Sequence, residues 1–124
     1  MRNIACINKN KYLTRVLFKF IIFFNKNKKS YIWILTEIMD TSLDTIYPKC
    51  TMSEQLISKI AHAVLNGLEF MNNKEILHRD IKPSNILLNI NGKIKLCDFG
   101  ISGFTKNSVC TSYRGCESYM SVSF

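Results

Sequence analysis

The sequence predicts an α+β fold, and three patterns along its 124 residues lead to that prediction. Residues 16–24 read VLFKFIIFF and residues 31–39 read YIWILTEIM; such apolar runs, rich in β-branched and aromatic residues, are typical of strands. Apolar residues recur every four positions over 56–68, which is typical of a helix with one apolar face. Two short aliphatic runs around Asn91-Gly92 predict a β-hairpin.

The net charge of +8 comes entirely from the first quarter of the chain. Residues 1–30 contain eight Lys or Arg residues and no acid, whereas residues 31–124 contain nine residues of each sign. A basic segment attached to a neutral domain differs from the domain-wide basic surface of nucleic-acid-binding proteins. We therefore expect no nucleic-acid partner; a basic nucleic-acid-binding module would rest on residues 1–30 alone.

Other features of the composition favour a soluble cytoplasmic protein. The longest apolar run, residues 16–24, is far shorter than the ~20 residues needed to cross a membrane, so we expect no membrane association. No small-residue cleavage site of a signal peptide follows this run. The five cysteines include no C-x-x-C pair, which favours reduced thiols over a disulfide framework or a zinc site.

The elements are predicted in order along the chain. Residues 1–15 show no periodicity and many Asn and Lys residues, so we expect an unassigned basic segment outside the domain. The polar stretch 25–30 (NKNKKS) separates the two apolar runs and predicts that they pair as antiparallel strands. Residues 40–50 form a connector with a short helical turn, and residues 101–124, rich in Ser, Gly and Thr, are expected to be loop.

A long helix is predicted to start near Thr51, because Glu54 three residues later would complete a capping box. We expect His62 on this helix to have no chemical role. The apolar stripe of the helix consists of Leu56, Ile60, Val64 and Leu68, with Ile57, Ala61 and Leu65 beside them.

Five polar groups are crowded into residues 78–85 (HRDIKPSN), between two aliphatic runs. Taken alone, Asp80 and Lys82 could be a surface ion pair of little consequence. A second carboxylate, Asp98, follows the predicted hairpin, whose two strands return the chain to near its start. We therefore expect Asp80, Asn85 and Asp98 to converge. Their oxygen atoms would suit Mg²⁺, and the ammonium group of Lys82 would remain available for phosphate.

The sequence HRDIKPSNILL followed by KLCDFG resembles the catalytic core of protein kinases, whose signature is H-R-D-x-K-x-x-N and then D-F-G. The stretches KPSN, IKLCDFGISG and GCESYMS resemble MAP kinase kinases in particular. These dual-specificity enzymes phosphorylate Thr and Tyr in the activation loop of a MAP kinase. The resemblance implies ATP and Mg²⁺ as cofactors, a MAP kinase as substrate, and an upstream MAP kinase kinase kinase as activator.

The same resemblance implies a partial protein-kinase-like fold over residues 16–124. Residues 16–40 would form the end of the small lobe and the hinge, and residues 41–124 the start of the large lobe. Thr36 would take the gatekeeper position between the strand and the hinge. Glu37 to Met39 would offer backbone groups to adenine, and Leu87 would form the floor beneath it.

The catalytic roles carry over from the resemblance position by position. Asp80 would orient the substrate hydroxyl and accept its proton, and Lys82 would hold the transferring phosphoryl group. Asn85 and Asp98 would bind the two Mg²⁺ ions. His78 would pack between the lobes together with Phe99, without acting as an acid or a base.

The resemblance also implies regulatory positions. Arg79 would receive a phosphate of the activation loop, because a guanidinium binds phosphate in a bidentate manner. Ser108 and Ser112 occupy the two phosphorylated positions, which stand four residues apart in this family. Cys97 lies at the back of the expected ATP site, although a small inert apolar residue is the simpler interpretation.

The chain departs from the family pattern at both ends. Its 124 residues contain no G-x-G-x-x-G loop and no V-A-I-K lysine, and residues 122–124 (VSF) stand where the family continues with Pro-Glu. We therefore expect a truncated, catalytically incompetent fragment of a MAP kinase kinase, with part of the apolar stripe of the long helix exposed. The alternative is a non-catalytic, kinase-derived binding or adaptor protein.

Overall fold

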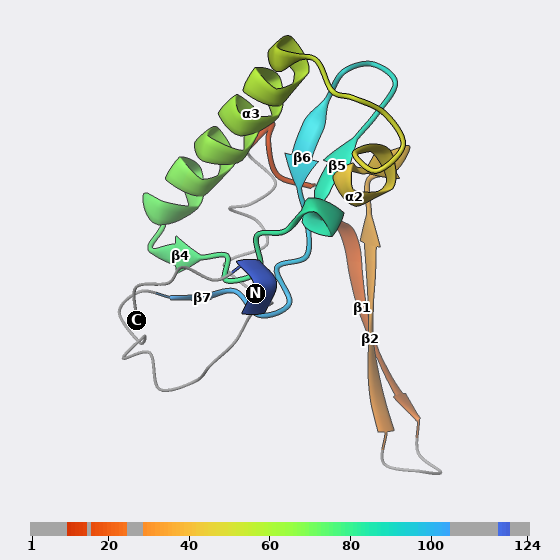
Figure 1. Cartoon of the computed structure of the whole chain (residues 1–124). Helices are drawn as coiled ribbons and strands as arrows, with labels where there is room; N and C mark the ends of the chain where they lie inside the picture. The colour runs from red at the N-terminus through yellow and green to blue at the C-terminus, as the bar shows by residue number, and fades with distance from the viewer. Residues whose placement is uncertain (1–9, 15, 25–28, 105–116, 120–124) are drawn as a thin grey trace.

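A long antiparallel hairpin projects from the rest of the structure (Figure 1). Its strands are β1 (Val16–Phe24) and β2 (Lys29–Thr36), and their register shifts between Val16 and Phe18. The two apolar runs of the sequence therefore pair as predicted. The computed structural model describes residues 10–14, 16–24, 29–104 and 117–119.

The long helix α3 spans Glu54–Asn72, and its start differs from the prediction. Ser53 is the N-cap residue, and its Oγ accepts a hydrogen bond of 3.3 Å from the backbone N–H of Leu56. The capping box of Thr51 and Glu54 is therefore wrong, since the first helical turn begins at Glu54 itself. A serine satisfies one of the free N–H groups at a helix start as well as a threonine does, so the sequence did not separate the two positions.

The helix buries one side of its predicted apolar stripe and exposes the other. Ile60 and Met71 are buried in the core, together with Ala63 and Gly67. In contrast, Ile57 and Leu65 are 50% and 65% exposed, and Ala61 is also exposed. The expected exposure of apolar surface on this helix is confirmed.

Short strands make up the remaining sheets (Figure 1). β3 (Thr41–Ser42), β5 (Ile86–Leu88) and β6 (Ile94–Leu96) form an antiparallel sheet in the order β3-β5-β6. β4 (Ile76–Leu77) pairs antiparallel with β7 (Gly103–Phe104). The short helices complete the described elements: α2 (Leu43–Ile46), η1 (Pro83–Asn85) and η3 (Glu117–Tyr119).

The predicted hairpin between residues 86 and 96 is confirmed, with a five-residue connection rather than a two-residue turn. Gly92 has a φ of 72°, a conformation that suits glycine because it has no Cβ. The side chain of Asn89 accepts hydrogen bonds from the backbone N–H groups of Asn91 and Lys93 at 3.1 and 2.9 Å. The turn is therefore closed by an asparagine that precedes the Asn-Gly pair.

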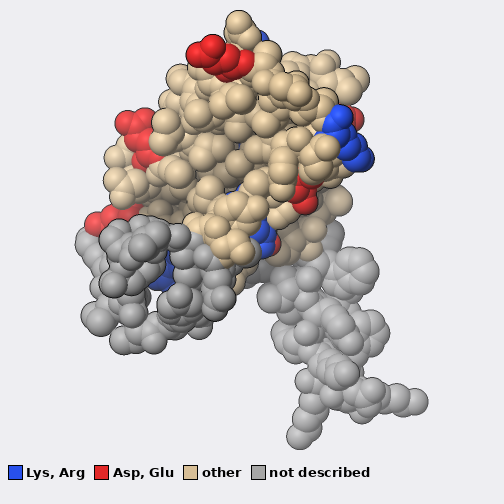
Figure 2. All heavy atoms as spheres, in the orientation of Figure 1, with Lys and Arg blue, Asp and Glu red and all other residues tan. Residues whose placement is uncertain are grey.

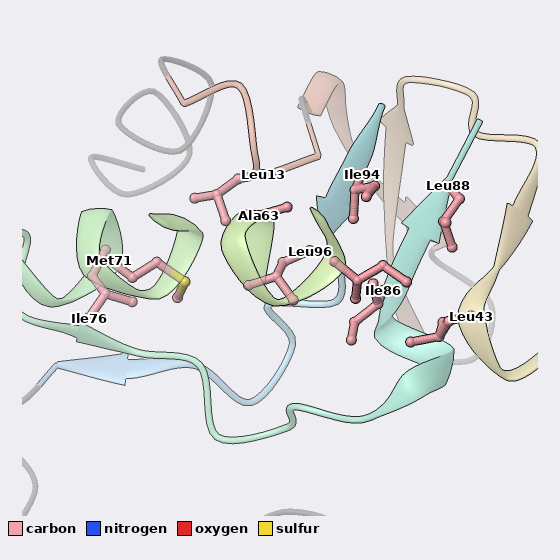
Figure 3. Packing of buried hydrophobic residues seen from close by; sticks show 10 residues of the cluster. Leu13, Leu43, Ala63, Met71, Ile76, Ile86, Leu88, Ile94 and Leu96 are labelled. Carbon is pink, nitrogen blue, oxygen red and sulfur yellow. The ribbon is translucent and has the colours of Figure 1, made fainter. Parts of the chain in front are cut away.

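The buried apolar side chains form a cluster between α3 and the three-stranded sheet (Figure 3). Leu13, Met71 and Leu96 are the largest fully buried side chains among the described residues. Figure 3 shows Leu13 and Leu96 beside Ala63 of α3, and Met71 next to Ile76 of β4. This cluster holds α3 against the hairpin that ends just before Asp98.

Residues 10–14 are part of this core, contrary to the expectation that residues 1–15 lie outside the domain. Leu13 is 0% exposed and forms a parallel bridge with Leu96 of β6. The backbone N–H of Thr14 donates to the carbonyl of Leu96 at 2.9 Å, and the N–H of Leu96 donates to the carbonyl of Tyr12 at 2.8 Å. Local composition missed the segment, because one leucine among polar residues shows no periodicity.

Within the described residues, no helix is both long enough and apolar enough to cross a membrane.

Leu13 provides a test of whether residues 10–14 belong to the core. Replacing this fully buried side chain, Leu13→Ala, should lower the free energy of unfolding by about 2–5 kcal/mol, because it removes apolar contacts and leaves a cavity. Leu65→Ala is the matched control on the exposed face of α3, and should change it by less than about 0.5 kcal/mol. Urea denaturation followed by circular dichroism measures both. Equal effects of the two substitutions would place Leu13 outside the core.

Candidate active site

The polar cluster of residues 78–85 lies between β4 and β5, and its centre is the carboxylate of Asp80. Asp80 is buried, and its Oδ2 lies 2.8 Å from the Nζ of Lys82. The Nδ2 of Asn85 donates to the same Oδ2 at 2.9 Å and to the backbone carbonyl of Asp80 at 2.8 Å. The structure therefore brings Asp80, Lys82 and Asn85 together; the predicted convergence of Asp80, Asn85 and Asp98 is seen here for Asp80 and Asn85.

Local geometry explains why these three side chains meet. Lys82 has an extended backbone, with φ of −156° and ψ of 161°, and Pro83 follows it at the start of η1. The fixed φ of proline suits the first position of a helical turn. This single turn reverses the chain between Lys82 and Asn85, so the side chain of Asn85 returns to Asp80.

The contacts of Asp80 decide its protonation state. The hydrogen bond from Lys82 lowers the pKa of the Asp80 carboxyl most, and the one from Asn85 adds to this, while burial acts in the opposite direction. The net pKa is below the usual value, so the group is a carboxylate at neutral pH. It can accept hydrogen bonds from a hydroxyl, but it is a weak base.

Asp98 is joined to this cluster through the backbone of Cys97. The N–H of Cys97 donates to the carbonyl of Asn85 at 3.0 Å. Asp98 itself has a φ of 59° and is exposed, and its Oδ1 accepts a hydrogen bond of 3.1 Å from the N–H of Gly100. Non-glycine residues with such φ values are uncommon and are concentrated at functional sites.

His78 lies between the two carboxylates and links both segments. Its Nδ1 accepts a hydrogen bond of 3.3 Å from the N–H of Asp80, and its Nε2 lies 3.0 Å from the carbonyl of Cys97. An accepting Nδ1 leaves the proton on Nε2, which donates to that carbonyl, so these contacts define the neutral ring. Phe99 packs edge-on against the ring at 5.3 Å between centroids.

Burial lowers the pKa of His78, although the carbonyl of Cys97 and the carboxylates of Asp80 and Asp98 act to raise it. Both carboxylates therefore lie near enough to act on the same imidazole. The ring is 3% exposed and uses both nitrogens for backbone contacts. His78 thus packs against Phe99 and binds backbone groups through both nitrogens, which is a structural arrangement.

Arg79 lies against the start of β7. It has a φ of 70°, and its guanidinium carbon would lie 2.8 Å from a Cβ placed on Gly103. A side chain at position 103 would therefore force the guanidinium to move. The hydroxyl of Ser102 also donates to the carbonyl of His78 at 3.2 Å. The loop of residues 78–85 and the segment after Asp98 are thus in direct contact. Ser108 and Ser112 lie outside the described residues.

The residues expected around adenine lie on β2, the following segment and β5. Thr36 ends β2 and is exposed, whereas Glu37 and Met39 are half-buried. Leu87 is half-buried in the middle of β5, where it pairs with Ser42 and Lys95.

Two oxygen-bearing side chains are available for Mg²⁺, those of Asn85 and Asp98. Among the described residues no group of three His, Cys, Asp or Glu side chains could hold a metal ion. Mg²⁺ in phosphoryl-transfer sites is usually bound by one or two carboxylates, with substrate phosphates and water completing the shell. Because Asp80 binds the Nδ2 of Asn85, the Oδ1 is left as the free acceptor. The donor set therefore fits Mg²⁺.

A buried ion pair behind the hairpin was not predicted. Lys95 of β6 is 6% exposed, and its Nζ lies 2.6 Å from the Oε1 of Glu37 and 3.4 Å from the carbonyl of Leu13. Side chains alternate in direction along a strand, so a lysine between Ile94 and Leu96 would face solvent if one face of β6 were open. Both faces of β6 are covered, so the charge needs a partner. The sequence feature that could have indicated this pair is Glu37, an acid that directly follows an apolar strand.

The buried imidazole of His78 makes stability depend on pH. Its pKa is lower in the folded chain than the ordinary value of 6.5, so the unfolded chain binds more protons between these two values. The free energy of unfolding should therefore fall as pH decreases below about 6.5. Asp80, whose pKa is lowered from 3.8, should add a further loss only at more acidic pH. Urea denaturation at pH 7.5 and 5.5 measures the first effect.

His62 offers the matched control, because this second histidine is exposed on α3. His62→Gln should leave the difference between pH 7.5 and 5.5 in place, whereas His78→Gln should reduce it. NMR titration of the two rings assigns the effect directly. An ordinary or raised pKa for His78 would contradict the neutral ring and its hydrogen bond from Asp80.

Cys97 and Cys50 should react differently with iodoacetamide. Burial and the neighbouring Asp98 raise the pKa of Cys97 to about 11, whereas Cys50 is an exposed free thiol. Because the thiolate is the reacting form, Cys97 should be alkylated at least about tenfold more slowly than Cys50 at pH 7.5. Mass spectrometry of the two peptides gives the rates, and the difference should disappear in 8 M urea. Faster alkylation of Cys97 than of Cys50 in the folded chain would contradict the raised pKa of the Cys97 thiol.

Comparisons with known proteins find a family model and relatives that match this chain. The family model described as "Protein kinase domain" matches residues 2–122. The MAP kinase kinase MKK1/SSP32 of Saccharomyces cerevisiae is 48% identical over 103 residues, which cover 78% of this chain and 20% of that protein. The dual specificity mitogen-activated protein kinase kinase sek-1 of Caenorhabditis elegans is 48% identical over 96 residues, which cover 72% of this chain and 29% of that protein.

The chain thus spans less than a third of the length of these two curated relatives. The match to the family model covers nearly the whole chain and includes both motifs of the site. It also includes residues 10–14, in agreement with their burial. The chain belongs to the protein kinase family and is similar, within it, to MAP kinase kinases.

Proposed function

We propose that the chain supplies the catalytic loop of a MAP kinase kinase. The reaction would be ATP-dependent phosphorylation of Ser, Thr and Tyr in the activation loop of a MAP kinase. The observation that carries this proposal is the geometry of Asp80, whose carboxylate lies between the Lys82 ammonium and the Asn85 carboxamide. A proton acceptor and a cation at 2.8 Å from one another suit a hydroxyl that attacks a phosphoryl group.

The proposed roles follow from the chemistry of each side chain. Asp80 orients the substrate hydroxyl and takes its proton as the new P–O bond forms and the bond to ADP breaks. Lys82 contacts an oxygen of the transferring group and offsets its charge. Asn85 and Asp98 would hold Mg²⁺, which supplies further neutralisation of phosphate charge when bound. His78 keeps the two segments in register through its backbone contacts.

The proposal extends to the regulatory and nucleotide-binding positions. Ser108 and Ser112 would be phosphorylated by an upstream MAP kinase kinase kinase. Arg79 supports this proposal, because its guanidinium lies against Gly103, just before the segment that contains both serines. The backbone of Glu37 to Met39 and the side chain of Leu87 would contact adenine.

A polypeptide limited to these 124 residues should show no measurable kinase activity. Its sequence contains neither the glycine-rich loop nor the V-A-I-K lysine that hold the phosphates of ATP in this family. The catalytic roles are therefore best tested in a chimaera, in which the part of this chain that matches the yeast relative replaces the corresponding segment of that protein. This design supplies the missing parts from a protein that is 48% identical over the compared region.

The chimaera should phosphorylate a MAP kinase, and Asp80→Ala should lower the rate at least about 10²-fold, because the proton acceptor is lost. Transfer of labelled phosphate measures the rate. Ser84→Ala, in the same turn, is the matched control and should retain most of the activity. A folded chimaera that is as active with Asp80→Ala as without it would contradict the proposed role.

A further inference from the structure

A cavity of about 770 Å³ lies on another side of the hairpin from the catalytic loop. Residues 10–12, α3 and the segment 92–95 line it, and Glu37 contributes from the end of β2. None of the proposed catalytic or metal-binding residues is among those that line it. In Figure 1 the segment 10–14, at the red end of the colour scale, passes behind α3 and β6. The cavity is therefore separate from Asp80, Lys82, Asn85 and Asp98; of the residues proposed to contact adenine, Glu37 alone lines it.

Lysine side chains dominate the charge of this cavity. Lys11, Lys59, Lys93 and Lys95 line it, and Glu37 is the one acid among the described residues that do so. The buried pair of Lys95 and Glu37, at 2.6 Å, cancels two of these charges. The remaining three ammonium groups come from three different walls.

These three lysines have no acidic partner within the described part of the chain. The Nζ of Lys11 lies 4.9 Å from the ring centroid of Tyr12, which is a cation–π contact and leaves its charge in place. Lys59 and Lys93 are exposed and form no ion pair there. Three positive charges therefore face one cavity without compensation from the residues that the structure describes.

The rest of the described surface has the opposite balance. Outside the cavity, the charged side chains that the structure describes comprise four basic residues (Lys49, Lys74, Arg79, Lys82) and seven acidic residues (Asp40, Asp44, Glu54, Glu69, Glu75, Asp80, Asp98). The cavity thus carries a formal +3 and its surroundings −3. Figure 2 shows acidic side chains spaced over the face in view, with few basic ones among them. Segregation of this kind concentrates positive potential in a concave site.

We propose that this cavity binds an acidic peptide segment of a partner protein. A volume of about 770 Å³ is within the range of sites that enclose a ligand of several residues, and is far larger than a single phosphate needs. Because the three lysines lie on separate walls, they could each pair with a different carboxylate along an extended acidic peptide. The rings of Tyr12 and His62 are in edge-on contact, with 6.0 Å between their centroids, and they add polarisable surface beside the lysines. The site does not depend on the catalytic role of Asp80.

Binding of a labelled hexaglutamate peptide to the full chain tests this proposal. Fluorescence anisotropy should detect binding that weakens with added salt, whereas hexaglutamine should not bind. The double substitution Lys59→Gln with Lys93→Gln should weaken hexaglutamate binding about fivefold or more, as expected for the loss of two exposed ion pairs. Ser58→Trp, which fills the cavity without changing charge, should also weaken it.

The control is Lys49→Gln with Lys74→Gln, which removes two exposed lysines that do not line the cavity. This variant should bind hexaglutamate within about twofold of the original chain. Equal weakening by the two double substitutions would show diffuse charge attraction and overturn the proposal. Unchanged binding after the substitutions at 59 and 93 would show that the peptide binds outside the cavity, and would also overturn the proposal.

Two further competitors separate acidic peptides from other anions. Inorganic phosphate at equal total charge should displace hexaglutamate poorly, since it cannot reach three walls at once. A six-nucleotide RNA should compete no better than expected from its charge. Displacement by phosphate at equal or lower concentration would identify a small-anion site and overturn the proposal. Preferential binding of the RNA would overturn it in favour of nucleic acid.

Discussion

The site depends on the backbone contact between the two ends of the β5–β6 hairpin. The hydrogen bond from Cys97 to Asn85 closes the hairpin, and the contact of His78 with the Cys97 carbonyl joins the preceding loop to the same point. These short-range restraints place Asp98 beside the loop that holds Asp80. Without them, two carboxylates separated by 18 residues would have no reason to meet, because like charges repel.

Buried polar groups around this contact are all satisfied within the described residues. His78, Asp80 and Asn85 share one set of hydrogen bonds, and Lys95 with Glu37 forms another behind the hairpin. A buried polar group without a partner would cost roughly 1–3 kcal/mol, so each set constrains its neighbours to one arrangement. The first set positions the proposed catalytic groups, whereas the second joins β6 to the end of β2 and to residues 10–14.

The two sides of the β5–β6 hairpin differ in the sign of their local charge. On the catalytic side, the carboxylates of Asp80 and Asp98 act on one neutral imidazole and suit cations and hydroxyl groups. On the other side, the lysine-lined cavity suits carboxylates. The net charge of +8 shows neither feature, because it sums residues on both sides of the hairpin and in the rest of the chain. A description of the surface by its local charges is therefore needed to separate the two sites.

The sequence by itself determined the α+β class, the strand pair and the long helix; of the predicted convergence of Asp80, Asn85 and Asp98, the structure shows the contact of Asp80 with Asn85. Each rests on neighbours within a few residues, whose periodicity or turn chemistry is local. Tertiary structure alone decided that Leu13 belongs to the core and that Lys95 is buried against Glu37. Those outcomes depend on contacts between distant segments, which leave no period in the chain and become visible when the surfaces that bury them come together.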